Sequence, residues 1–334
     1  MNRRDFIMAL AGGIASAAAG PGGRTKQEKR MEPKKDRTGR KSVISLVKTN
    51  ERSTGIAKAI DLLGINPVKG RKVLLKPNFN TADPFPGSTH NDTLIHLIEH
   101  LKRMGAAEIT LGERSGPPDT ADVMADKGIF DLCKKLGVGL INFEELPDDQ
   151  WVRIKPGQST WLRGFDVAKP VLDAECVVTT CCLKTHAYGG VFTMSLKLSV
   201  GVTRKRNMAE LHSSFLGMRK MIAEINQAYA PGLVVLDAIE AFTDGGPGHG
   251  TRKRADVIIA GADRVAIDAT GIAVLKDLGS TKDIMSRKIF DQEQISRAAE
   301  IGLGVAKAED IEIRTGDDAS RQYADRLREI LATG

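Results

Sequence analysis

The sequence predicts an α/β fold, with a mostly parallel, doubly wound sheet and a small β-hairpin insertion. Short apolar runs alternate with helical patterns from residue 42 onward, and most of these runs are apolar at successive positions. Strands of this kind are buried on both faces, which is typical of a parallel sheet covered by helices. The two runs near 150–168 follow each other without a helical pattern between them, which indicates the hairpin.

The first half of the predicted sheet contains helices with clear end signals. A helix over 55–64 repeats apolar residues on one face and ends at Gly64. A second helix is expected over 92–104, with Asp92 as its N-cap and Gly105 just beyond its end. Strands are expected at 43–48, 72–77, 108–113 and 138–143.

The second half begins with the hairpin, formed by runs at 151–156 and 160–168, and then returns to alternation. Asp263 is predicted to cap the helix that follows it. Strands are expected at 175–182, 232–239, 255–262 and 311–316, and helices at 207–229, at 264–279 and after the last strand. Residues 42–334 are therefore predicted to form one α/β domain.

The N-terminal residues 1–23 resemble a twin-arginine (Tat) export signal. Arg3 and Arg4 precede an apolar run of Ala and Gly with small residues suited to cleavage. This resemblance implies export by the Tat translocase to a periplasmic or other extracytoplasmic location. The run is short for a bilayer span of about 20 residues. No stable transmembrane segment is expected unless the signal stays uncleaved as an anchor; a chance apolar start is the alternative.

The net charge of +7 lies entirely in the first 41 residues, because residues 42–334 are electrically balanced. Residues 24–41 are a basic segment without apolar periodicity, and we predict a disordered linker there. A nucleic-acid-binding domain would need a basic face on the fold itself. Aromatic residues make up only 4% of the chain, which also disfavours base stacking. We expect no nucleic-acid partner.

The four cysteines at positions 133, 176, 181 and 182 form neither a disulfide framework nor a CxxC motif. Cys181 and Cys182 are adjacent, so their side chains point to opposite faces of a strand. We interpret them as small hydrophobic residues on a buried strand. A redox or cluster site is the alternative.

Polar clusters follow four of the predicted strands, at the sheet edge where open α/β folds bind ligands. In the first cluster, Lys76 ends a strand and Asn78 follows it, and Thr89 and His90 come just before the next helix. Free N–H groups at a helix start favour anions. The cluster therefore predicts an anion site, with an ordinary capped connection as the alternative.

The second cluster contains Lys184 and His186, placed just beyond a strand, and Lys197 within a later apolar segment. Burial lowers the pKa of a lysine and makes its amine a better base or nucleophile. These three residues are candidates for catalysis, together with His90. For Lys197, a stem that lies along apolar surface is the alternative.

The third cluster, in the stretch 236–250, offers Asp237, Glu240, Gly245, Gly246 and His249 for substrate binding. Glycine N–H groups can form an anion-binding concavity, whereas the acidic groups and the histidine could instead hold a divalent metal. No spacing of a known metal motif is present, so the metal is left unknown.

The fourth cluster places Asp268 in the first turns of a helix, where it could pair with a lysine of a neighbouring loop. Dinucleotide-binding GxGxxG, Walker A, nucleophile-elbow and HExxH motifs are absent from the sequence, which disfavours the enzyme classes that use them.

These four clusters resemble the DUF362 family. The matching stretches are VLLKPNF with the later STH (73–90), CLKTH with SLKLSVG (182–201), LDAIEAFTDGGPGHG (236–250) and IIAGADRVAIDATG (258–271). The family includes members with an appended ferredoxin-like segment, but this chain has no ferredoxin-type iron–sulfur motif. The cofactor therefore stays unknown. The second stretch reads SLKLSVG where relatives often have Lys-Asn, so a role that needs this Asn is not carried over.

The leading hypothesis is an exported enzyme that acts on a small anionic substrate, a carboxylate or a phosphate. Lys76, Lys184 and Lys197 would bind or activate the anion, and His90 or His186 would move protons. A non-catalytic protein that binds a ligand or handles a cofactor in the cell envelope is one alternative. A metal or redox protein, based on the paired cysteines with His186 and His249, is another.

Overall fold

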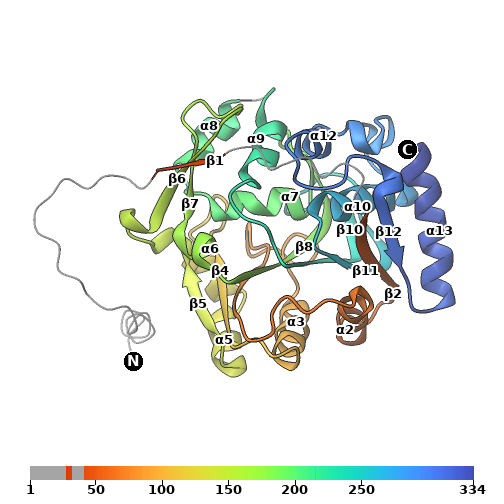
Figure 1. The fold of residues 1–334 in the computed structure, drawn as a ribbon, viewed down its shortest axis with the longest axis horizontal. Helices are drawn as coiled ribbons and strands as arrows, with labels where there is room; N and C mark the ends of the chain where they lie inside the picture. Colours follow the sequence, from red (N-terminus) through yellow and green to blue (C-terminus); the bar gives the residue numbers. More distant parts are fainter. Residues whose placement is uncertain (1–27, 32–40, 215) are drawn as a thin grey trace, which may run out of the picture.

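The computed structural model describes residues 28–31, 41–214 and 216–334 (Figure 1). The predicted export signal lies outside these residues, as does most of the predicted linker. Within that linker, strand β1 (Glu28–Met31) pairs in parallel with β6 (Trp151–Pro156). The prediction of a disordered linker does not hold for these four residues. Their own sequence has low strand propensity, and the strand forms because its backbone pairs with β6.

Strands and helices alternate along most of the described chain. The other strands are β2 (Ser42–Lys48), β3 (Lys72–Lys76), β4 (Glu108–Glu113), β5 (Gly139–Asn142), β7 (Phe165–Ala168), β8 (Cys176–His186), β9 (Val191–Thr193), β10 (Leu233–Phe242), β11 (Arg252–Gly261) and β12 (Ile311–Arg314). The helices are α2 (Arg52–Leu63), α3 (Asn91–Arg103), α4 (Thr120–Asp126), α5 (Ile129–Leu136), α6 (Lys169–Asp173), α7 (Ser195–Leu198), α8 (Asn207–Ser213), α9 (Met218–Ile225), α10 (Arg264–Leu278), α11 (Lys282–Met285), α12 (Glu293–Glu300) and α13 (Asp318–Thr333).

The main sheet has the strand order β12-β2-β11-β10-β8-β3-β4-β5, and β9 pairs with the end of β8. Most neighbours are parallel, whereas β11 is antiparallel to both β2 and β10, and β9 is antiparallel to β8. Strands β6 and β7 form an antiparallel hairpin in a separate sheet with β1. The predicted fold class is confirmed, including the small hairpin.

Both faces of the main sheet are covered (Figure 1). Val73, Leu75 and Val178 pack in a cluster with helices α2, α3, α4 and α5. On the opposite face, Val177 packs with the three-stranded sheet and α9, and Leu183 packs with α10, α12 and α13. Alternate residues of one strand therefore serve both layers, which explains why the strands are apolar at successive positions.

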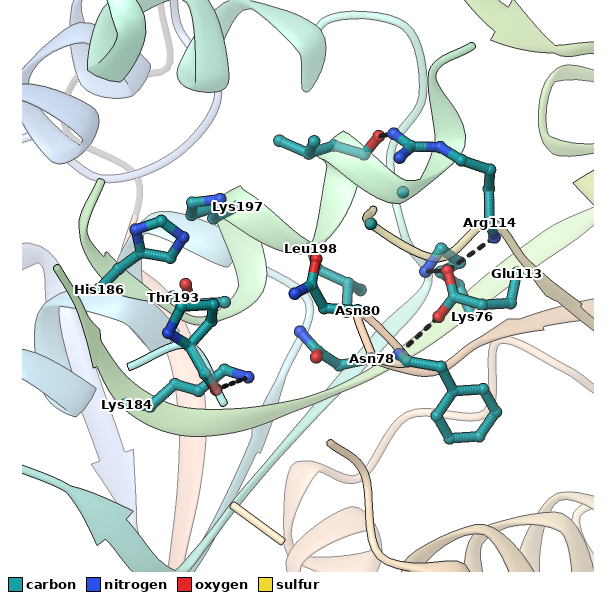
Figure 2. A pocket seen from close by; sticks show the side chains of 15 residues that line it. Lys76, Asn78, Asn80, Glu113, Arg114, Lys184, His186, Thr193, Lys197 and Leu198 are labelled. Atoms are coloured by element: carbon teal, nitrogen blue, oxygen red, sulfur yellow. Dashed lines mark hydrogen bonds and ion pairs between the residues drawn. The ribbon is translucent and has the colours of Figure 1, made fainter. Parts of the chain in front are cut away.

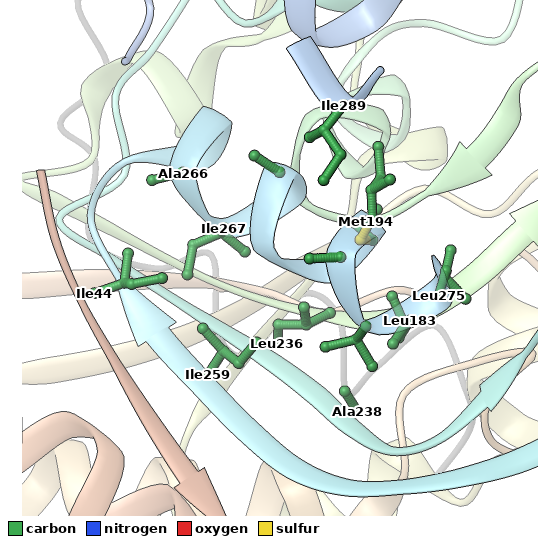
Figure 3. Packing of buried hydrophobic residues seen from close by; sticks show 14 of the residues in the cluster. Ile44, Leu183, Met194, Leu236, Ala238, Ile259, Ala266, Ile267, Leu275 and Ile289 are labelled. Carbon is green, nitrogen blue, oxygen red and sulfur yellow. The ribbon is translucent and has the colours of Figure 1, made fainter. Parts of the chain in front are cut away.

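Helix α10 is buried along most of its length and packs on β2, β10 and β11 (Figure 3). Gly271 permits a close approach, because a Cβ atom at this position would lie 2.2 Å from Sδ of Met194. Met194 directly precedes α7. The packing of α10 therefore fixes the place where α7 begins.

The sequence predicts the helix ends well where a cap residue marks them. Gly64 and Gly105 follow their helices in left-handed conformation, with φ of 66° and 85°, and Asp263 caps α10. The predicted cap at Asp92 is wrong, because Nδ1 of His90 accepts the N–H of Asp92 and the helix begins at Asn91.

Several predicted elements differ in extent, among them the second strand of the hairpin, which covers Phe165–Ala168 and not the predicted 160–168. Strand β8 continues to His186, because β9 pairs with residues 184–186 and the end of β10 pairs with Leu183 and Lys184. The helix predicted over 207–229 is interrupted between α8 and α9, where serine and glycine lower helix propensity. None of the helices in the described ranges has the length and apolar character needed to cross a bilayer.

Candidate functional site

The carboxyl ends of three neighbouring parallel strands, β3, β4 and β8, border one small pocket. Its volume is about 50 Å³. We call it the inner pocket, and it is lined by Lys76, Asn78, Phe79, Asn80, Glu113, Arg114, Gly116, Lys184, His186, Thr193, Lys197, Leu198, Val200, Gly201 and Pro247. Figure 2 shows Lys184, His186, Thr193 and Lys197 on one side, and Lys76, Glu113 and Arg114 on the other. A water needs roughly 10–15 Å³ of such volume, so the pocket suits a group of a few atoms.

Lys76 and Glu113 form a buried ion pair at the ends of β3 and β4. Burial lowers the pKa of Lys76 and raises the pKa of Glu113, and each partner opposes the shift of the other. Glu113 also accepts the N–H groups of Phe79 and Arg114, each at 2.8 Å. A Cβ atom at Gly201 would lie 2.8 Å from Nζ of Lys76, so the backbone packs directly against the pair. The charge of Lys76 is therefore already balanced within the protein.

Lys184 is fully buried and has no carboxylate partner among the described residues. Its ammonium donates to the carbonyl oxygen of Gly87 and, at 3.0 Å, to that of Pro247. It thereby joins the loop after β3 to the loop between β10 and β11. Burial lowers the pKa of Lys184 to about 8, although nearby thiol and carboxylate groups oppose the shift. Two of its three N–H donors are occupied by neutral carbonyl groups, so its positive charge is not neutralised.

Lys197 projects from α7 into the inner pocket (Figure 2). Within the described part of the chain, no hydrogen bond or ion pair holds its half-buried ammonium. Burial lowers the pKa of Lys197 to about 8, with the positive charges of Lys184 and Arg114 acting in the same direction. A cation in this setting is destabilised and gains from a nearby anion.

His186 lies beside Lys197, and its side chain is only 9% exposed. Burial lowers the pKa of His186 to about 2, and the charges of Lys197 and Lys184 add to the shift. The imidazole is therefore neutral near pH 7, where one nitrogen donates and the other accepts. A Cβ atom at Gly190 would lie 2.9 Å from both Nδ1 of His186 and Cε of Lys197. The absence of a side chain at Gly190 thus permits the two groups to approach each other.

Three buried polar atoms around the inner pocket have no hydrogen-bond partner among the described residues. They are Oδ1 of Asn78, Nδ1 of His186 and Oγ1 of Thr193. Buried polar atoms are nearly always paired with protein, water or ligand. All three lie around one pocket, together with the ammonium of Lys197, which is unpaired within the described ranges. This arrangement indicates a binding site for a polar ligand.

Arg114 adds a further cation to the pocket wall. Its guanidinium donates to the carbonyl oxygens of Thr203 at 2.9 Å, Ser115 at 2.8 Å and Val200. Burial lowers the pKa of Arg114 to about 10, so it stays charged near pH 7. The pocket lining therefore contains three lysines and one arginine against the single carboxylate of Glu113. Its electrostatics favour an anion.

Several predicted site residues support the loops instead of lining the inner pocket. Thr89 accepts the N–H of Asn78 through Oγ1 at 2.9 Å, and His90 caps α3. Asp237 accepts from Nε of Arg52 at 2.7 Å and from Oγ1 of Thr93 at 2.6 Å. These contacts hold α2 and α3 to the sheet.

Asp268 has a different partner from the one predicted. Its carboxylate accepts the N–H groups of Ser195 at 2.8 Å and Leu196 at 3.0 Å, and no lysine of the described residues pairs with it. Burial raises the pKa of Asp268 to about 7, against the effect of these two hydrogen bonds. The interaction ties α10 to the first turn of α7, and α7 carries Lys197. Asp268 is therefore a positioning residue.

The loop after β10 reaches the inner pocket only through Pro247. The backbone of Gly246 donates to the carbonyl of His249 at 2.6 Å, which turns the chain back on itself. The side chains of Glu240 and His249 do not line the inner pocket, and Gly245 borders a second pocket. Within the described ranges, no three His, Cys, Asp or Glu side chains come close enough to form a metal site.

The four cysteines are free and buried. Burial raises the pKa of Cys182 to about 11, and that of Cys181 is raised as well. Thiols of this kind are unreactive near neutral pH. Cys176, Cys181 and Cys182 lie on β8 and Cys133 lies on α5, and the burial of all four agrees with their interpretation as small hydrophobic residues.

Sequence reasoning missed two charged side chains of the inner pocket, Glu113 and Arg114. Glu113 ends a strand that the sequence predicts correctly. Because open α/β sheets bind ligands at the carboxyl ends of their strands, Glu113 could have been predicted as a site residue.

Fold and site together define an α/β protein that gathers lysines at the carboxyl ends of a mostly parallel sheet. The chain belongs to the DUF362 family, described as a domain of unknown function, whose model matches residues 73–273. The resemblance drawn from the sequence motifs is thus confirmed.

Two individual proteins are similar to this chain. The thylakoid-associated protein sll1697 of Synechocystis sp. is 24% identical over 208 residues, which are 60% of this chain and 61% of that protein. The chain therefore matches about three fifths of the length of this relative. The lactate racemase apoprotein from Thermoanaerobacterium thermosaccharolyticum aligns with 85% of each chain, at 13% identity and a TM-score of 0.44.

Proposed function

We propose that the inner pocket binds the anionic group of a small molecule, a carboxylate or a phosphate. The observation that carries this proposal is the ammonium of Lys197, which has no partner among the described residues. Three polar atoms around the same pocket also lack a partner there. An anion would pair with Lys197 and Lys184, and Thr193 would donate a hydrogen bond to it. Charge-assisted hydrogen bonds of this kind are about twice as strong as neutral ones.

We further propose that the protein is an enzyme that moves a proton on the bound molecule. Lys197 suits this role because a pKa of about 8 is close to physiological pH. In its neutral form, while Lys184 holds the anion, Lys197 would accept a proton from the substrate and later return it, so no electrons are gained or lost. The neutral ring of His186 would orient the substrate by a hydrogen bond. This assignment replaces His90, which is bound to the start of α3.

The binding proposal is tested by calorimetric titration of the purified protein with sulfate, phosphate and acetate. Lys197→Met should weaken the binding of the anion that the native protein takes by at least about tenfold, the value of one charge-assisted hydrogen bond. The control is Lys220→Met, which removes an exposed lysine of α9. Equal affinity of Lys197→Met and the native protein would refute the assignment of the pocket.

A non-catalytic binding protein is the alternative that the same pocket supports. Mass spectrometry of the molecule that co-purifies with the native protein separates the two functions. If that molecule is recovered unchanged after incubation, in stoichiometric amounts, the protein is a binder. If it exchanges a hydrogen for deuterium from heavy water in a reaction that Lys197→Met abolishes, the protein is an enzyme.

We also propose that the protein is exported by the Tat translocase, on the basis of Arg3 and Arg4 and the apolar run after them. Replacement of both arginines by lysine should leave the protein in the cytoplasm, as measured by cell fractionation and immunoblotting. Unchanged fractionation of this variant would refute the proposal.

A further inference from the structure

A second and larger pocket shares His186 with the inner pocket. Its volume is about 400 Å³. We call it the outer pocket, and it is lined by Thr185, His186, Ala187, Gly189, Val191, Arg219, Gly245, Thr281, Asp283, Arg287 and Gln292. Among the described residues, only His186 lines both pockets. The volume is within the range of about 300–1,000 Å³ that is usual for small-molecule sites.

The volumes of the two pockets differ enough for them to hold different parts of one ligand. The inner pocket, at about 50 Å³, has room for a carboxylate or a phosphate but not for the organic part of a metabolite. A ligand whose anionic group binds Lys197 must therefore place its remaining atoms elsewhere. The outer pocket begins at the same imidazole and is about eight times larger.

The outer pocket is lined by polar groups of both signs. Arg219, Arg287 and Asp283 line it, and Glu293 already pairs with Arg219 at 2.7 Å and with Arg287 at 3.5 Å. Thr185, Thr281 and Gln292 add uncharged hydrogen-bonding groups. The charges nearly cancel, so this pocket does not select a second anion. Groups that both donate and accept, such as hydroxyls, match such a lining.

The junction between the pockets is held in a defined conformation. Val191 pairs with His186 across β8 and β9, and it has a φ of 63°, which is unusual for a β-branched residue. Arg219 also donates to the carbonyl of Gly189 at 2.9 Å, which anchors the turn between the two strands. His186, which lines both pockets, is thus held in place, and its Nδ1 has no hydrogen-bond partner among the described residues.

We propose that the substrate is a polyhydroxylated anion, with its acidic group in the inner pocket and its hydroxylated body in the outer pocket. His186 contacts the atoms that join the two parts. This inference rests on the proposed anion-binding function and names its substrate class. An organic acid and a phosphate ester share this chemistry, and the experiment distinguishes them.

The test compares head groups with extended molecules by isothermal titration calorimetry on the full chain. Acetate and phosphate are the head-group probes, and gluconate and glucose 6-phosphate are the extended probes. One extended probe should bind at least about tenfold more tightly than its head group, since each good hydrogen bond contributes a factor of this order. Tighter binding of gluconate identifies an acid, and tighter binding of glucose 6-phosphate identifies an ester.

The double variant Arg287→Ala with Thr281→Val alters only the outer pocket. It should remove most of the advantage of the extended probe and leave the head-group affinity unchanged. Arg321→Ala, on the exposed surface of α13, is the matched control. The inference is overturned if the head group binds but neither extended probe binds more tightly, or if the double variant keeps the full advantage. If no probe binds at all, the proposed function itself fails, and the inference fails with it.

Discussion

Replacement of Lys197 by methionine should make the protein more stable, although it removes a group from the proposed site. The change of the Lys197 pKa from the usual 10.5 to about 8 corresponds to roughly 3 kcal/mol of destabilisation of the charged form. The half-buried position lets water screen part of this energy, so we expect a gain of about 1–3 kcal/mol at pH 7. Methionine keeps the length of the side chain and fills the same space.

The effect should depend on pH in a defined direction. The folded-state pKa of Lys197 is lowered, so the unfolded chain binds more protons between pH 8 and 10.5 and native stability rises over this interval. The advantage of Lys197→Met should therefore be complete below pH 8 and decline above it. With these two pKa values, it falls to about a quarter by pH 10.

Urea denaturation at pH 7 and pH 10 measures both quantities. The control variant Lys220→Met changes an exposed lysine and should alter the free energy of unfolding by no more than about 0.5 kcal/mol at either pH. If Lys197→Met is no more stable than the native protein at pH 7, the ammonium is not destabilised by the pocket. An equal gain at pH 7 and pH 10 would show that packing, not charge, is responsible.

Three further predictions concern the groups around Lys197. The affinity for sulfate should fall as the pH rises from 7 to 9.5, because Lys184 and Lys197, with pKa values of about 8, lose their charge while sulfate keeps its own. Binding should then be accompanied by proton uptake, which calorimetry in two buffers detects. Glu113→Gln should lower the free energy of unfolding by about 3–5 kcal/mol, because it leaves Lys76 buried without a counter-ion. Adding Lys76→Met should restore much of that loss. Urea denaturation measures both effects, and additive effects would contradict the pairing. Asp268→Asn should weaken sulfate binding, because an amide cannot accept both N–H groups at the start of α7, whereas unchanged affinity in the folded variant would remove Asp268 as a positioning residue.

The sequence predicts the part of the site that follows from strand order and strand ends. Lys76 and Lys184 come together because β3 and β8 are parallel neighbours, so their carboxyl ends meet at one edge. Asp237 is different. It lies between Leu236 and Ala238, which face the cluster around α10, so the alternation of β10 turns it toward α2 and α3.

Other features depend on tertiary contacts that the sequence does not display. The position of Lys197 follows from the packing of α10 against Met194 and from the hydrogen bonds of Asp268. Strand β9, which carries Thr193, has three residues and exists through its pairing with β8. Short elements of this kind carry too little periodicity to be predicted.

The uneven balance of charge shows where an anion should bind within the inner pocket. Glu113 neutralises Lys76 at one side, whereas Lys184 is held by carbonyl groups that carry no net charge. Lys197 has neither kind of partner among the described residues, so the largest uncompensated charge lies next to His186. An anion drawn to that side would sit at the entrance of the outer pocket and not at the Lys76–Glu113 pair. On this argument the pair serves as a rigid wall, and Lys197 and His186 are the groups that meet the substrate.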